Sequence, residues 1–505
     1  MLHSVSCYGV STLTSLTSGP MSYLARVKSE IDANPSLQPL LQFLSPSPLG
    51  ISGRQARVEF IEYSKDPRAQ RPSLPVHADL QDVITRVNAS IGGVVEDICG
   101  CTLIIEDIQP RQVQLLGESL SIDPVFFAGY LGTNYRSVER HPLPPWATTL
   151  PSESATQEFC HIHYQRVIKL EEHFDISEKD LLISSTNVPR AVKRLPPLNG
   201  VDIAFARTCT SVLRKCFDSG FWICLIVVDS TTADVIPQPR TQNCTPTFRV
   251  RQTPLHSSIR PGMSFTNSST AKILQAHAKL PPSEFDRLVA SVADTATFSI
   301  RNPSMVLLCS SSLRFALREF LVYSATMHRY VKHYEYSSKD LSFALRGDDI
   351  DDLQIWRRRA FQTLQKLLAM KNFIEYWSTE EQLLGVPQAA WLIKDIQHLI
   401  TAIEHHSRSL EAIIPVTMAM VQLVDMRRSV EEASHVKQLT YLALVFVPLS
   451  FVTGLFSMSE HVSPGSSGFW LYFVVAIPLL FLVLGASCFV PLRTSLARRR
   501  QKSLR

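Results

Sequence analysis

Two long runs of apolar residues near the C-terminus dominate the hydrophobic pattern of the chain. Residues 439–458 and 469–492 contain no Asp, Glu, Lys or Arg. A helix of about 20 apolar residues crosses the hydrocarbon core of a bilayer, so each run is long enough to span a membrane. Soluble cores rarely contain two such runs so close together. The pattern therefore predicts two transmembrane helices joined by an outer loop at residues 459–468.

A regular stripe of apolar residues leads into the first run. From Pro387 onward they recur at intervals of three and four, with one gap at His406 and with Thr417 in the same stripe. Heptad-like spacing of this kind indicates packing between helices. We expect residues 301–438 to form a helical stalk that continues into the first span, with any kink at Pro415. The residues of the stripe are Leu392, Ile396, Leu399, Ile403, Leu410, Ile413, Met420 and Val424.

The N-terminal half has the mixed pattern of strands and helices. Apolar runs of strand length, alternating or continuous, occur at residues 57–63, 101–108, 158–170 and 221–229. Helical spacing occurs at residues 112–120 and 122–131, and within the stalk at residues 305–334 and 355–377, the last two separated by an acidic turn at 347–352. The run at 221–229 is apolar throughout, which is typical of a central strand. We expect an α/β cytoplasmic domain over residues 53–300, with a long loop at 230–270 and a poorly ordered region at 1–52.

The predicted fold is thus an α+β cytoplasmic domain followed by long stalk helices and two C-terminal transmembrane helices. Residues 493–505 are rich in Arg and Lys, whereas the loop at 459–468 has neither. The positive-inside rule places this tail in the cytoplasm, where it can contact anionic lipid, and two spans return the N-terminal part to the same side. Residues 1–20 lack the apolar core of a secretory signal peptide. We expect a two-pass protein, in the plasma membrane rather than in mitochondria.

Composition excludes several other classes of protein. The 505 residues are 45% hydrophobic and 19% charged, so the chain is not disordered throughout. Ten cysteines are too few for a disulfide scaffold, and a net charge of +5 gives no reason to expect nucleic acid as a partner. The sequence has no HExxH, P-loop or GxSxG motif, so we do not expect an enzyme. The acidic residues at 348–352 are more typical of a solvated turn or helix start than of a cation site, and Cys160, His161 and His163 more typical of a strand than of a zinc site.

Residues 438–459 resemble the pore helix of the CorA magnesium-channel superfamily. The match covers its L-T, F-x-P-L-[ST]-F and G-[IL]-[YF]-G-M-N elements without a gap, at Leu439, Thr440, Phe446, Pro448, Leu449, Phe451, Gly454 and Met458. Residues 101–131 resemble the cytoplasmic domain of fungal CorA-like proteins, and the resemblance as a whole spans residues 55–505. It implies a homopentameric funnel whose first span lines a central pore. It also implies passive transport of a divalent cation, Mg²⁺ first, with no permanently bound cofactor and with Mg²⁺ as the regulatory ion.

The family's Gly-Met-Asn tripeptide is replaced here by Ser457, Met458 and Ser459. In the family this tripeptide forms a ring that holds hydrated Mg²⁺ at the pore entrance. Ser459 keeps a hydroxyl that can accept hydrogen bonds from the ion's waters, and it is the candidate metal-binding residue there. The resemblance assigns as pore-lining Ser459, Met458, Ser457, Gly454, Ser450, Val447, Leu439 and Val436. Where the family has a regulatory carboxylate this chain has Gln422, and the nearby Asp425 is the candidate substitute.

Two readings other than a channel remain open at this point. The changed tripeptide and the uncharged Gln422 fit a non-conducting CorA-like scaffold or regulatory paralogue that has lost its selectivity filter. The two apolar runs alone also fit a hairpin-anchored protein whose soluble domain binds a partner. Flux through purified protein separates the first reading from a channel, and the oligomeric state separates the second.

Overall fold

The computed structural model describes residues 22–45, 55–65, 73, 75–93, 97–132, 150–170, 182–196, 202–231, 234–237, 248–251, 283–294, 303–337, 347–382, 387–458, 470–483 and 485. The chain divides into two compact units. The first comprises residues 1–333 and 355–410, and the second residues 334–354 and 411–505.

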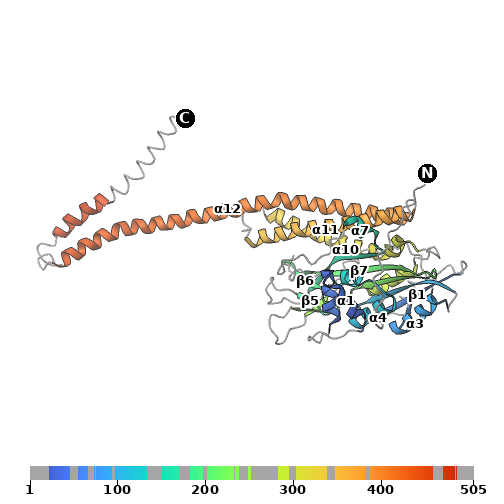
Figure 1. Ribbon diagram of the computed structural model, residues 1–505. Helices are drawn as coiled ribbons and strands as arrows, with labels where there is room; N and C mark the ends of the chain where they lie inside the picture. Colours follow the sequence, from blue (N-terminus) through green and yellow to red (C-terminus); the bar gives the residue numbers. More distant parts are fainter. Residues whose placement is uncertain are drawn as a thin grey trace. The chain divides into compact units, whose positions relative to one another are not determined.

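A ten-stranded sheet forms the centre of the first unit within the described residues (Figure 1). Its spatial order is β2-β1-β3-β8-β7-β4-β10-β9-β5-β6. The predicted strand at 221–229 is confirmed, because β8 lies between its parallel neighbour β3 and its antiparallel neighbour β7. The strands are β1 (Arg57–Ser64), β2 (Val76–His77), β3 (Ile98–Glu106), β4 (Phe159–Leu170), β5 (Leu182–Ser184), β6 (Ala191–Arg194), β7 (Ile203–Cys216), β8 (Trp222–Val228), β9 (Asp234–Pro237) and β10 (Phe248–Arg251).

The last six strands of this order close on themselves. β6 ends the order but also pairs with β7, so β7, β4, β10, β9, β5 and β6 form a ring. Two of these strands, β9 and β10, lie within residues 230–270, so the prediction of a long loop there is wrong for those two segments. The ring has its own small apolar cluster, which consists of Ile168, Leu170, Leu182, Val192, Ala204, Ala206 and Val235.

Short helices cover one side of the sheet and share an apolar cluster with it. They are α1 (Tyr23–Glu30), the 3-10 helix Pro35–Leu37, α2 (Gln38–Leu44), α3 (Leu80–Ile91), α4 (Pro110–Ser119) and α5 (Pro124–Leu131). Helix α5 starts as predicted at Pro124, since the Asp123 carboxylate accepts a hydrogen bond from the Val125 N–H, and it ends at Gly132, whose φ of 69° suits glycine. Two further short helices are α7 (Pro151–Thr156) and α9 (Glu284–Asp294).

The expectation of a poorly ordered region at residues 1–52 is wrong for residues 22–45. Tyr23, Val27, Leu37, Leu40 and Leu44 are all buried in the apolar cluster that the short helices share with the sheet, which anchors α1 and α2. The Tyr23 ring lies directly against Gly117 of α4 and fills the space that a Cβ atom at Gly117 would occupy. Burial of these side chains stabilises helices that would be too short to form alone.

Three long helices follow, and within the first unit α10, α11 and the first part of α12 lie beside the sheet (Figure 1). They are α10 (Met305–Ser337), α11 (Gly347–Glu380) and α12 (Pro387–Ser457), which confirms the predicted helices of the stalk. Residues 347–352 belong to the start of α11, so they do not form a turn between two helices. Of the two alternatives considered for the acidic residues there, a solvated turn and a helix start, the structure shows the helix start, a position where acidic residues are favoured.

The apolar stripe of α12 is buried over its first part. Leu392, Ile396, Leu399, Ile403 and Leu410 are all 3% exposed or less, and His406, which interrupts the stripe, is only 7% exposed. In the second unit Ile413 and Thr417 are buried, while Val424 is exposed. The helix continues through Pro415 and Pro448 to Ser457 without a break.

Helix α12 contains a segment long and apolar enough to cross a membrane, and only 6% of that segment is buried. A core helix of a soluble protein of this composition would be mostly buried. A shorter apolar helix, Trp470–Val483, follows within the second predicted span. The predicted outer loop at 459–468 and basic tail at 493–505 lie outside the described residues.

Candidate pore-lining segment

The predicted pore-lining residues in α12 share one face of the helix. At 3.6 residues per turn, Val436, Leu439, Val447, Ser450, Gly454 and Ser457 fall within about 100° of arc. Their side chains are exposed, with 64% exposure for Val436, 69% for Leu439 and 64% for Val447. We call this the open face of α12.

The opposite face of the same segment packs against the helix Trp470–Val483. Val452 is only 3% exposed, and the rings of Phe456 and Tyr472 meet edge to face with their centroids 6.1 Å apart. The hydroxyls of Thr453 and Tyr472 lie 3.1 Å apart, within hydrogen-bond distance. The second apolar helix therefore covers the back of α12 and leaves the open face uncovered.

Hydroxyl groups along the segment bond to the backbone of their own helix. The Ser450 hydroxyl donates to the Val447 carbonyl at 2.9 Å, and the Thr440 hydroxyl donates to the Val436 carbonyl at 2.8 Å. Because its hydrogen is used in this way, the Ser450 oxygen keeps lone pairs for accepting hydrogen bonds from outside the helix. The waters that Mg²⁺ retains are donors, so an exposed acceptor of this kind suits a hydrated magnesium ion.

Gly454 leaves the open face without a side chain one turn beyond Ser450. A Cβ atom built there would meet no other atom within 4 Å. Ser457 ends the helix and Met458 follows it, with 89% of its surface exposed. Ser459 lies outside the described residues.

The candidate regulatory residue Asp425 also lies on α12, and its side chain is exposed. It is three turns before Val436, so the helical repeat places it on the open face. The same repeat places Ala443 there, midway between Leu439 and Val447. Ala443 was not among the predicted pore residues, although the interval of eight between its two neighbours on the stripe indicates a missing member.

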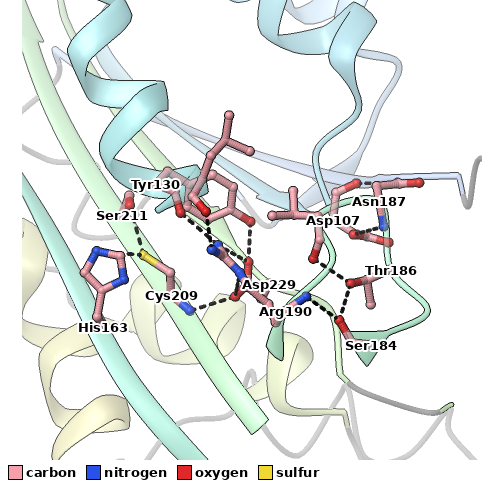
Figure 2. Close-up of polar contacts among 12 residues, drawn as sticks. Asp107, Tyr130, His163, Ser184, Thr186, Asn187, Arg190, Cys209, Ser211 and Asp229 are labelled. Carbon is pink, nitrogen blue, oxygen red and sulfur yellow. Dashed lines mark hydrogen bonds and ion pairs between the residues drawn. The ribbon is translucent and has the colours of Figure 1, made fainter. Parts of the chain in front are cut away.

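A cluster of buried polar residues lies in the α/β domain rather than on α12, and its members hydrogen-bond to one another (Figure 2). The Arg190 guanidinium donates two hydrogen bonds of 2.8 Å to the Asp229 carboxylate, and it also donates to the backbone carbonyls of Tyr130 and Leu131. The Tyr130 hydroxyl and the Cys209 N–H donate to the same carboxylate, both at 2.7 Å. Burial alone would lower the pKa of Arg190, but the Asp229 carboxylate raises it above its usual value.

The Arg190–Asp229 pair therefore links the residue before β6 and the residue after β8 to α5 and β7, rather than offering donors to a ligand. Asp107 is linked to the segment between β5 and β6 that carries Arg190, since it accepts a hydrogen bond from the Asn187 N–H at 2.9 Å (Figure 2). A buried ion pair whose donors and acceptors are satisfied in this way fixes geometry.

The histidines of β4 are held inside the domain. The His161 ring bonds to the Ser211 hydroxyl at 2.7 Å and lies against Gly129 of α5, and burial lowers the pKa of His161 to about 4. His163 lies 4.0 Å from the Cys209 sulfur. Within the part of the chain that the structure describes, no group of three or more His, Cys, Asp or Glu side chains is placed to hold a metal ion.

Comparison with known families and structures gives a match in the same part of the chain. The family model described as "CorA-like Mg2+ transporter protein" matches residues 325–493. No curated protein matches the chain.

Two solved structures are similar at low identity. "The complete structure of CorA magnesium transporter from Methanocaldococcus jannaschii" is 10% identical, covers 85% of this chain and 96% of its own, and gives a TM-score of 0.33. The "structure of the full-length CmaX protein" is 13% identical, covers 88% and 99%, and gives a TM-score of 0.35. TM-scores this low carry no conclusion. The family match does not depend on these two structures. Residues 325–493, which include the open face of α12, are a CorA-like Mg²⁺ transporter domain.

Proposed function

We propose that this protein is a passive Mg²⁺ channel of the plasma membrane, in which α12 of each subunit lines a central pore. The subunits form a homopentamer, each subunit crosses the membrane twice, and both termini lie in the cytoplasm. The family match at residues 325–493 supports the membrane location and the cargo. The observation that carries the pore assignment is the open face of α12, which remains uncovered while the opposite face packs on the second apolar helix.

The chemistry of the open face changes along its length in the order that ion passage requires. Ser457, Met458 and Ser459 stand at the outer entrance, where hydroxyl and carbonyl oxygens accept hydrogen bonds from the waters of a hydrated ion. Ser450 offers a second ring of acceptor oxygens. Deeper in the pore, Val447, Leu439 and Val436 form an apolar constriction that closes by excluding water. Repetition of each position around a symmetric axis converts single side chains into rings.

Regulation follows from Asp425 at the cytoplasmic end of the open face. Carboxylates of neighbouring subunits are the ligands that a divalent cation prefers. Occupancy by Mg²⁺ holds the subunits together and favours the closed state, and loss of the ion removes this link and favours opening. Mg²⁺ is then both the transported and the regulatory ion.

The decisive experiment is Mg²⁺ uptake into liposomes that contain the purified full-length protein and an internal Mg²⁺ dye. We expect flux well above that of empty liposomes, and we expect Gly454→Trp to abolish it. The single chain has room for a side chain at this position, so loss of flux with an intact fold and oligomer reports obstruction of the shared pore. Leu442→Trp is the matched control, because Leu442 is exposed on another face of the same helix.

A non-conducting scaffold or regulatory paralogue is the second candidate. The observation that favours it is the tripeptide Ser457, Met458 and Ser459 in place of Gly-Met-Asn. The double substitution Ser457→Gly and Ser459→Asn separates the two candidates. A gain of flux would show that the conduction path is intact behind a modified entrance, whereas a verified pentamer that stays silent with either tripeptide would establish the scaffold.

A further inference from the structure

Two histidines meet in the packed part of the stalk. The rings of His328 on α10 and His406 on α12 lie with their centroids 5.2 Å apart and their planes inclined by 38°. Both belong to the first compact unit. His406 stands where the apolar stripe of α12 requires an aliphatic residue, and its neighbours on the stripe, Ile403 and Leu410, are almost fully buried.

The surroundings favour the uncharged form of His406. The pKa of His406 is lowered to about 4, mainly by burial and to a lesser extent by the neighbouring His328 and His405. The His405 and His406 rings are 5.8 Å apart. These two histidines are the titratable groups that face His406 from α10 and from its own helix, and α11 adds none within the described residues. The ion pair between Glu404 and Arg408 lies on the exposed surface of α12.

We propose that the His328–His406 contact is a proton-sensitive latch that holds α12 against α10 at neutral pH and releases it when the cytoplasm becomes acidic. A proton on His406 would place a positive charge in an apolar seam beside a second histidine. The charged ring is stable only where water reaches it, so protonation favours the arrangement in which α12 has separated from α10.

The size of the effect follows from linkage between protonation and packing. A released His406 has the ordinary histidine pKa of about 6.5, whereas the packed one stays uncharged down to pH 4. Between pH 7.5 and pH 5.5 the equilibrium therefore shifts toward release by about tenfold. The proton-linked shift is negligible above about pH 7.5 and reaches its full size below about pH 4.

The latch acts on the segment that carries the open face. Helix α12 runs without interruption from His406 to Ser457, so His406 and Ser450 belong to one continuous helix. This part of the inference rests on the proposed function, because it predicts higher Mg²⁺ flux when the latch is released.

Hydrogen exchange tests the latch without reference to transport. Full-length protein in nanodiscs is exchanged at pH 7.5, 6.5 and 5.5, and the rates are corrected for the intrinsic pH dependence of amide exchange. We expect about tenfold weaker protection at pH 5.5 in peptides that cover residues 399–413 and 321–333. His406→Leu should keep its protection at all three values, because leucine restores the apolar stripe.

A matched control and a second variant keep this test decisive. His398→Leu removes an exposed histidine from the same helix and should leave the pH response of the seam unchanged. His328→Leu removes the partner ring and should reduce the response even if His406→Leu does not fold. Equal loss of protection in wild type and in folded His406→Leu or His328→Leu would overturn the latch.

Liposome flux at pH 7.5 and 5.5 then tests the link to the pore. We expect wild-type flux to rise on acidification and His406→Leu flux to change little. If wild type conducts but both proteins respond equally to pH, the link to the pore is wrong. If neither protein conducts, the proposed function fails while the exchange data still decide whether the latch exists.

Discussion

Arg214 of β7 donates a hydrogen bond of 2.9 Å to Glu381, just beyond the end of α11. Glu381 in turn accepts hydrogen bonds from the Met305 N–H at 2.7 Å and from the Ser304 hydroxyl at 2.6 Å, which satisfies donors at the start of α10. A single carboxylate thus joins the sheet to the start of α10 and the end of α11. Anionic groups are favoured at a helix N-terminus, so its charge as well as its geometry suits this position.

Replacing that carboxylate should loosen the stalk from the sheet. We expect Glu381→Gln to lower stability by about 2–4 kcal/mol, since it leaves the buried Arg214 without full charge compensation. Thermal unfolding of the detergent-solubilised protein measures the change. Glu380→Gln is the neighbouring control, for which a change near zero is expected. An equal response of the two variants would contradict the role of Glu381.

Two variants at the Arg190–Asp229 pair should lower stability by different amounts. Asp229→Asn should destabilise the domain by about 3–5 kcal/mol because it leaves a buried guanidinium unpaired. Tyr130→Phe removes one hydrogen bond to the same carboxylate and should cost only about 1 kcal/mol. Denaturant unfolding of both variants gives the order, and a reversed order would show that the pair does not contribute as its geometry indicates.

Packing of the N-terminal helices is testable at Gly117. A methyl group there collides with the Tyr23 ring, so Gly117→Ala should destabilise the protein by about 1–3 kcal/mol even though alanine is the better helix former. Gly92→Ala, where the added Cβ has a nearest neighbour at 3.4 Å, should change stability much less. Proteolysis should release residues 22–45 faster from Gly117→Ala than from Gly92→Ala.

Stability of the α/β domain should fall in mild acid. Burial lowers the pKa of His161 to about 4, whereas an unfolded chain binds the proton near pH 6.5. The unfolded state therefore gains protons first, and stability is lost as the pH falls from about 6.5 to about 4, with no further loss from this group below that. We expect His161→Phe to flatten the fall in melting temperature across this window. An unchanged slope would mean that other groups control it.

Ala443 should limit the width of the proposed pore. Ala443→Phe should reduce Mg²⁺ flux strongly, because a ring from each subunit would enter the path at the level between Leu439 and Val447. Leu442→Phe, on a different face, should leave flux close to wild type. Comparable flux from the two variants would place Ala443 away from the conduction path.

Elements that bury one side over many residues could be predicted from the sequence, because burial imposes a regular spacing of apolar residues. The stripe from Leu392 to Leu410 repeats over five turns, and a buried seam of that length leaves an unmistakable period in the sequence. The continuous apolar run of β8 reflects burial on both faces of a central strand.

Shorter elements left too little signal. Helices α1 and α2 each bury only two residues in the domain core, and a single pair four residues apart is too short a pattern to indicate a helix. Strands β9 and β10 have four residues each and depend on the closure of the ring, which is a long-range property. For the candidate pore face, the positions that share one side of the helix follow directly from the sequence. Its role as a pore stays a prediction. Ala443 was missed because motif matching, rather than the repeat itself, selected the residues.

The closure of β7, β4, β10, β9, β5 and β6 determines what the sheet offers to other polypeptides. A strand lacks spare backbone groups for recruiting another chain wherever both of its sides are paired, and closure gives β6 a neighbour on each side, β5 and β7. Among the described strands this leaves β2 as the terminal one, and it is two residues long with both side chains exposed. So brief an edge is a poor template for aggregation. Closure therefore removes one of the two ends at which the described sheet could extend into another copy of the chain.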